Sequence, residues 1–160
     1  MIIVLMGVTG SGKTTTGRKL AESLGWKYFD ADDFHSTANV TKMRSGVPLN
    51  DEDRKPWLES LQRLIQNSLA NKEPAILACS ALKQSYRDVL LVDERVKLVY
   101  LKGNYNLIKE RLAARSNHYM NPALLDSQFE TLEEPEDALS IDLKTPPDKI
   151  VEIIRAQLNI

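Results

Sequence analysis

The chain has 160 residues, enough to bury roughly two-thirds of its unfolded surface, and we expect a single domain over residues 1–160. Its 21 Lys and Arg residues nearly balance 22 Asp and Glu residues, for a net charge of −1. This balance argues against a protein that binds nucleic acid or an anionic membrane, because both need a broadly basic surface. No apolar run approaches the roughly 18 residues of a membrane span, and the N-terminus lacks a basic leader, so we expect a cytoplasmic protein.

Apolar residues Ile2 to Met6 predict a short buried strand, which leads directly into a glycine-rich loop. Residues 7–14 read Gly-Val-Thr-Gly-Ser-Gly-Lys-Thr and match the phosphate-loop pattern GxxxxGK followed by Ser or Thr. Glycines let such a backbone curl until several N–H groups point at phosphate oxygens, where a side chain would collide. A helix predicted from Thr15 to Leu24 directs its positive end at the phosphate. The alternative, an accidental glycine-rich turn, does not explain the flanking strand and helix.

Each fixed position of this loop has an expected role. Lys13 is expected to place its charge on the β- and γ-phosphates of a nucleotide, and the Thr14 hydroxyl to bind Mg²⁺. The loop does not reveal whether the phosphate is transferred to water, to a small molecule or not at all. The residues expected to bind the nucleotide are Gly7, Val8, Thr9, Gly10, Ser11, Gly12, Lys13, Thr14 and Thr15.

A second short strand, Trp26 to Phe29, is predicted after the helix stop signal Gly25, and Asp30 and Asp32 follow it. Carboxylates at the C-terminal end of a parallel strand lie near the ligand crevice of an open α/β sheet. On an extended strand end both side chains point the same way, one toward the Mg²⁺ shell and the other toward an acceptor hydroxyl. The alternative is that these acidic residues merely punctuate a turn before a helix.

The rest of the chain alternates between helices and strands. Helices are predicted at about residues 36–45, from 51 onward with Pro56 near the start, 84–92, 106–114, 123–130 and after Pro147, and strands at 74–79, 96–101 and 139–142. This order predicts an α/β fold with about five parallel strands and helices on both faces. The polar segment 115–121 and the helix after it, about residues 115–130, form a candidate lid.

Arg111 and Arg115 lie one helical turn apart at the edge of this candidate lid. From there two guanidinium groups can fold over the phosphates and stabilise the charge that develops during transfer. A solvated helix face is the equally reasonable alternative.

Further polar side chains lead out of the expected crevice. Each of the cations can bind an acidic substrate, although a single one is more often a surface charge. His35 can bond a substrate hydroxyl or cap the next helix, and His118 can do the same from the lid, but neither has the spacing of a zinc ligand. Cys79, in an apolar run, indicates a buried core residue rather than a nucleophile. The candidate cations are Lys42, Arg54, Lys83 and Arg87.

Several runs beyond the loop are distinctive. Residues 49–58 read Leu-Asn-Asp-Glu-Asp-Arg-Lys-Pro-Trp-Leu, residues 80–83 read Ser-Ala-Leu-Lys, and residues 128–132 read Gln-Phe-Glu-Thr-Leu. Together with the loop and the acidic run from Asp30 to Asp32, they make nearly the whole chain resemble the small gluconate kinases. These belong to the phosphate-loop (P-loop) kinase group and are relatives of shikimate kinase. The run at 49–58 and the run at 80–83 narrow the resemblance to gluconate.

The resemblance implies a P-loop kinase fold with a small lid and phosphorylation of D-gluconate at its 6-hydroxyl by ATP with Mg²⁺, in a homodimer. Thr14 and Asp30 are then the metal residues, and Asp32 is the base or orients the acceptor hydroxyl. An anionic polyol needs a cation and several donors. The expected catalytic residues are Lys13, Asp32, Arg111 and Arg115, and the expected substrate-binding residues are Asp32, His35, Lys42, Arg54, Lys83 and Arg87.

Two departures from the family pattern leave the acceptor open: Asp33 replaces an expected apolar residue, and Asn117 to Met120 form a less basic lid than expected. A kinase for shikimate, another aldonic acid or a nucleoside monophosphate is the main alternative. A regulatory ATPase is the second, although a chain of this length leaves little room for a partner-driven switch.

Overall fold

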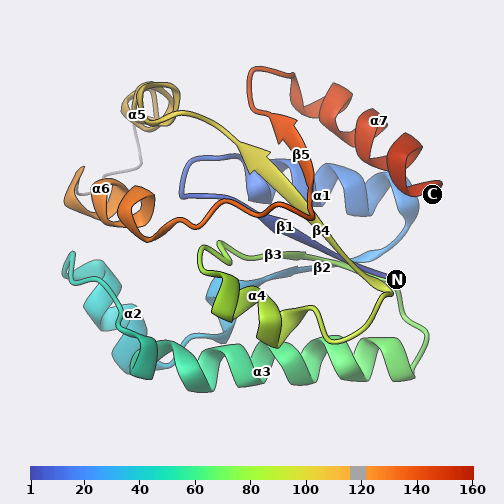
Figure 1. Cartoon of the computed structure of the whole chain (residues 1–160), viewed down its shortest axis with the longest axis horizontal. Coiled ribbons are helices and arrows are strands. Elements are labelled where there is room, and N and C mark those ends of the chain that lie inside the picture. Colours follow the sequence, from blue (N-terminus) through green and yellow to red (C-terminus); the bar gives the residue numbers. More distant parts are fainter. Residues whose placement is uncertain (116–121) are drawn as a thin grey trace.

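The computed structural model describes residues 1–115 and 122–160, and its centre is a five-stranded parallel sheet (Figure 1). The strands lie in the order β2-β3-β1-β4-β5, so the first strand is central and chain segments from both halves flank it. This arrangement confirms the predicted parallel sheet of five strands. The strands are β1 (Ile2–Met6), β2 (Lys27–Asp30), β3 (Ala75–Ala78), β4 (Val96–Lys102) and β5 (Leu139–Asp142).

Both faces of β1 are buried because its alternating side chains enter two separate cores. Val4 and Met6 pack in the core that includes Leu61 and Ile65 on one face, whereas Leu5 packs with the core on the other face. All five β1 residues are buried, as expected for a strand covered by helices on both sides.

Helices form a layer on each face of the sheet (Figure 1). On one side, α3 and α4 contact each other, and on the other side α1 contacts α7. Figure 1 shows α2 beyond the start of α3, and α5 and α6 beyond the end of β4. The helices are α1 (Lys13–Leu24), α2 (Thr37–Arg44), α3 (Asp51–Ala70), α4 (Gln84–Leu90), α5 (Tyr105–Ala113), α6 (Pro122–Thr131) and α7 (Pro147–Leu158).

The long helix α3 begins at a capping box. The Asn50 side chain accepts the N–H of Asp53, and the Asp53 carboxylate accepts the N–H of Asn50. The helix then continues through Pro56, as the sequence pattern predicts. Because this cap fixes the first turn, it also fixes the direction in which the side chain of Arg54 leaves the helix.

One expected detail is wrong. The chain does not stay extended after Asp30, because residues Ala31–Phe34 form a short 3₁₀ helix, η1. The Asp30 carboxylate accepts the N–H of Asp32 at 3.0 Å and caps this turn. Asp30 and Asp32 therefore do not share one side of an extended strand. The irregular part of the candidate lid, residues 116–121 with His118, lies outside the described residues.

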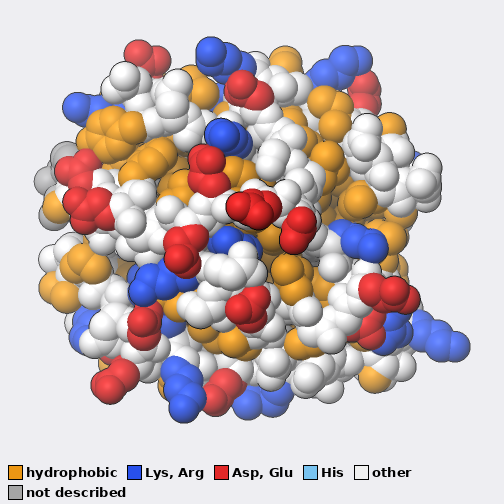
Figure 2. Space-filling model, viewed as in Figure 1, with side chains coloured by type: hydrophobic (Ala, Val, Ile, Leu, Met, Phe, Trp, Pro, Cys, Tyr) orange, Lys and Arg blue, Asp and Glu red, His pale blue; other side chains and the backbone are white. Residues whose placement is uncertain are grey.

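On the face seen in Figure 2, basic and acidic side chains are interspersed. This mixture agrees with a net charge near zero, so anion binding depends on local sites. Of the helices in residues 1–115 and 122–160, none is both long and apolar enough to cross a membrane.

Candidate active site

The glycine-rich loop joins β1 to α1 and has the backbone of a phosphate cradle. Gly10 and Gly12 have φ values of 76° and 84°, which L side chains rarely adopt. A Cβ atom added to Gly12 would meet no atom within 4 Å, so the backbone here borders open space. The N-terminus of α1 points at this space, which suits an anion.

Lys13 lies inside the loop. Its Nζ donates to the carbonyl oxygens of Gly7 and Val8 at 2.9 and 3.0 Å and lies 3.5 Å from Ser11 Oγ. Burial lowers the pKa of Lys13, while the carboxylate of Asp32 acts in the opposite direction. The ammonium is thus held by neutral acceptors that a phosphate can replace.

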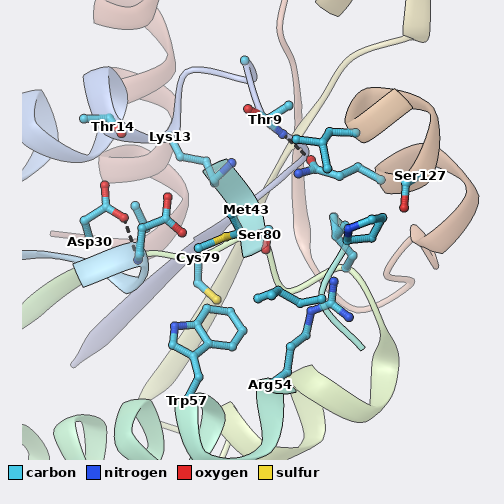
Figure 3. A pocket seen from close by; sticks show the side chains of 18 of the residues that line it. Thr9, Lys13, Thr14, Asp30, Met43, Arg54, Trp57, Cys79, Ser80 and Ser127 are labelled. Atoms are coloured by element: carbon cyan, nitrogen blue, oxygen red, sulfur yellow. Dashed lines mark hydrogen bonds between the residues drawn. The ribbon is translucent and has the colours of Figure 1, made fainter. Parts of the chain in front are cut away.

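A cavity of about 690 Å³ opens beside this loop (Figure 3). Its walls come from the phosphate loop, from η1, from α2 and the segment after it, from α3, from the segment after β3, from α4, from the residues after α5 and from α6. In Figure 3, Lys13 and Asp30 point into the space from the side of the phosphate loop and β2, whereas Arg54 and Trp57 rise from α3. The expected site residues that line it are Thr9, Gly10, Gly12, Lys13, Thr14, Thr15, Asp30, Asp32, Arg54 and Arg115.

Asp32 has the electrostatics of a proton acceptor. Desolvation by the cavity walls raises its pKa most, and repulsion from Asp30 raises it further, whereas Lys13 lowers it. A carboxyl group whose pKa moves toward neutral pH is a better general base. Asp30 and Thr14 line the same cavity, and their oxygen atoms are the type of donor that Mg²⁺ prefers.

The part of the wall that α3 and α4 supply combines the aromatic rings of Trp57 and Tyr86 with the guanidinium of Arg54. Trp57 is buried, and its Nε1 donates to the carbonyl of Ala31 at 2.7 Å, which ties α3 to η1. Arg54 donates from Nη1 to the hydroxyl of Tyr86 at 3.0 Å. This wall can therefore hold an acceptor that has an apolar surface and a negative charge.

His35 lies behind this wall and does not line the cavity. Its ring stacks on Trp57 with centroids 4.4 Å apart, and the Asn39 amide lies 3.4 Å from its Nδ1. Burial lowers the pKa of His35 to about 4, so the ring is neutral at pH 7. Its contacts stabilise the wall.

The structure does not bring four of the expected cations to the cavity. Lys42 pairs with Asp53 at 2.9 Å, and Lys83 pairs with Asp51 at 3.2 Å. Each of these lysines therefore already has a carboxylate partner on α3.

The other two cations bond backbone carbonyls. Arg87 is 1% exposed and donates to the carbonyls of Ala81 and Leu82, and Arg111 donates to the carbonyl of Leu143. These contacts tie the two arginines to loops of the fold, and neither arginine lines the cavity.

Several lining residues were missed by the sequence reasoning. Gln128 on α6 accepts the N–H of Thr9 at 2.7 Å and so ties α6 to the phosphate loop. Arg44 ends α2 and lines the cavity beside residues 45–49. Cys79 is buried, as expected, and its thiol borders the cavity with a pKa raised to about 12 by burial. The run at residues 128–132, which supports the family resemblance, could have indicated Gln128 as a site residue, but no local sequence pattern indicates Arg44.

The Shikimate kinase family model matches residues 9–155 of the chain. A Dictyostelium discoideum protein named "Probable gluconokinase" is 46% identical, over 96% of this chain and 84% of that protein. The thermosensitive gluconokinase of Escherichia coli K12 is 42% identical, over 95% of this chain and 84% of that enzyme. A solved gluconokinase structure from Sinorhizobium meliloti 1021 superposes with a TM-score of 0.88 at 39% identity, over 98% of this chain and 90% of that one. The chain therefore has the P-loop kinase fold and belongs to the gluconokinase family, which is related to shikimate kinase.

Proposed function

We propose that this protein transfers the γ-phosphoryl group of ATP to the 6-hydroxyl of D-gluconate, giving 6-phospho-D-gluconate and ADP. The observation that carries the proposal is one cavity in which a phosphate loop, Asp32 and Arg54 meet, in a chain about 40% identical to named gluconokinases over nearly its whole length. An anionic polyol needs a cation to bind its carboxylate and a carboxylate beside its reacting hydroxyl, and Arg54 and Asp32 can supply these two groups in the cavity.

In this proposal each wall has a separate task. The loop amides and Lys13 bind the phosphates, and Asp32 orients the acceptor hydroxyl and takes its proton. Arg54 binds the acceptor carboxylate, and Arg115 adds positive charge on the phosphate side. Four cations are left out of direct contact with substrate, because they do not line the cavity and bond groups within the fold: Lys42, Lys83, Arg87 and Arg111.

Mg²⁺ fits the oxygen donors Thr14 and Asp30, and when bound it would neutralise charge on the phosphates that are being transferred. The Asp30 carboxylate accepts the N–H of Asp32 through Oδ1 at 3.0 Å, whereas Oδ2 has only a long contact of 3.5 Å with the Tyr28 hydroxyl, so Oδ2 is the oxygen that a metal would take. Family resemblance further supports a cytoplasmic homodimer, and analytical ultracentrifugation at several protein concentrations tests the dimer.

The test is ADP release from Mg-ATP with D-gluconate, and with L-idonate, shikimate and AMP as parallel acceptors. We expect a strong rate with D-gluconate, whereas a preference for shikimate or AMP would overturn the assignment. Partner-stimulated hydrolysis without an acceptor would instead indicate a regulatory ATPase.

The proposed base has its own test. Asp32→Asn is expected to lower kcat by about 100-fold or more while the Kd for ATP stays within about threefold. Full turnover by Asp32→Asn would show that another group takes the proton.

A further inference from the structure

The carboxylate of Asp51 lies close enough in the sequence to form an ion pair with Arg54. Asp51 lies three residues earlier on α3, a spacing at which Asp and Arg side chains pair directly on a helix surface. Yet the guanidinium of Arg54 is directed to the hydroxyl of Tyr86, a neutral group. Arg54 and Tyr86 line the cavity, and Asp51 does not.

The directions of the hydrogen bonds explain how this arrangement is held. The Tyr86 hydroxyl donates its single proton to Asp51 Oδ1 at 2.5 Å, so it can meet Arg54 Nη1 at 3.0 Å only as an acceptor. Lys83 Nζ lies 3.2 and 3.4 Å from the two oxygens of Asp51. The Asp51 carboxylate thus already bonds the phenol of Tyr86 and the ammonium of Lys83.

The ring of Tyr86 is fixed in this position. Tyr86 is 6% exposed, and the cations of Arg54 and Lys83 lie 5.4 and 5.6 Å from its ring centroid. The hydrogen bonds from Tyr86 and Lys83 also lower the pKa of Asp51, which keeps this carboxylate ionised. Without its two present partners, an ionised Asp51 would be free to pair with Arg54.

We propose that Tyr86 and Lys83 hold Asp51 away from Arg54, so that the guanidinium forms no direct ion pair with Asp51 and stays directed into the cavity for the acceptor carboxylate. The assignment of that carboxylate rests on the proposed function. Tyr86 and Lys83 are positioning residues here, because they act on the substrate through Arg54. A direct pair between Asp51 and Arg54 would draw the guanidinium out of the cavity.

The test is a double-mutant cycle on Tyr86 and Asp51. Tyr86→Phe is expected to raise the KM for D-gluconate about tenfold, with kcat and the KM for ATP within about twofold. Tyr86→Phe combined with Asp51→Asn is expected to bring the gluconate KM back to within about threefold of wild type. Asp51→Asn alone completes the cycle.

A matched control is Tyr100→Phe, which removes another tyrosine–carboxylate bond, that of Tyr100 with Glu134 at 3.3 Å, outside the cavity. We expect this variant to keep the wild-type KM for gluconate. If the second substitution does not rescue Tyr86→Phe, or worsens it, the tyrosine does not act by holding Asp51 away from Arg54 and the proposal is wrong.

A second measurement does not depend on the substrate. The guanidinium NMR signals of Arg54, assigned with Arg54→Lys, report its hydrogen-bond partner. We expect them to move in Tyr86→Phe to positions typical of a carboxylate-paired arginine, and to return in the double variant. If the signals do not move in Tyr86→Phe, the proposal that Tyr86 keeps Asp51 from pairing with Arg54 is wrong. If they do move but the protein shows no gluconate-dependent release of ADP, only the proposed acceptor is wrong.

Discussion

The sequence predicts that Arg87 binds substrate, whereas its contacts in the structure indicate that it stabilises the fold. The substitution Arg87→Met removes a buried guanidinium that donates to the carbonyls of Ala81 and Leu82 at 2.8 and 3.0 Å, and to Gln84 Oε1 at 3.1 Å. Ala81 is fully buried and has a φ of 46°, a conformation that the arginine helps to hold. Arg87 therefore fixes the turn that carries Ser80 into the cavity.

The expected loss follows mainly from the carbonyl of Ala81, because the carbonyl of Leu82 still accepts the N–H of Glu133 at 2.8 Å. A buried polar group without its partner destabilises a fold by about 1–3 kcal/mol, so Arg87→Met should lower the free energy of unfolding by about 1–3 kcal/mol. For a chain of this size, 1 kcal/mol corresponds to about 2–4 °C in the melting midpoint, so a fall of at least about 2 °C is expected.

The assay is urea unfolding followed by circular dichroism, together with steady-state kinetics well below the melting midpoint. Arg63→Met is the control, because Arg63 is exposed and donates only to Ser60 Oγ among the described residues. A variant Arg87→Met with unchanged stability and a large rise in the gluconate KM would refute the structural role and restore Arg87 as a substrate ligand.

Three further predictions concern other parts of the site. Because burial raises the pKa of Asp32, its ionised form destabilises the folded chain at pH 7, so Asp32→Asn should raise the melting midpoint. This gain should shrink as the pH falls toward 3.8, where the carboxyl group becomes protonated in the folded and in the unfolded chain. Gly17→Ala would place Cβ 2.7 Å from the ring of Tyr28 and should destabilise the fold by about 1–3 kcal/mol, measured by urea unfolding. Gln128→Ala removes the partner of the Thr9 N–H, so the KM for ATP should rise severalfold while the gluconate KM stays unchanged; an equal rise in both would contradict this assignment.

The fold was predictable because its signals are local. The central strands β1, β3 and β4 are short and largely apolar, and most helices have apolar residues at helical spacing, so their order indicated the parallel sheet. The 3₁₀ helix at Ala31–Phe34 was missed because it depends on one side chain: the Asp30 carboxylate turns back onto the N–H of Asp32. Acidic residues in a row suggest a turn but do not specify its geometry.

The phosphate side of the site was predictable, and much of the acceptor side was not. The loop motif specifies its own conformation within eight residues, so its members could be named from the sequence. In contrast, Lys83 meets Asp51 across 32 residues, and Arg111 meets Leu143 across 32 residues. Such partners are decided by tertiary packing, and a sequence pattern cannot distinguish a cation that is available for substrate from one already used within the fold.

The strand order separates the two sides of the cavity in a way that affects how such a site can evolve. In the proposed function the lining residues from Met43 through Tyr86, which follow β2 and β3, form the acceptor wall, whereas the phosphate loop and α6 follow β1 and β4. Insertions or substitutions between α2 and α3 can therefore reshape the acceptor wall and leave the backbone of the loop undisturbed. New acceptors can be acquired by mutation on one side of the sheet while the capacity to bind nucleotide is inherited intact on the other.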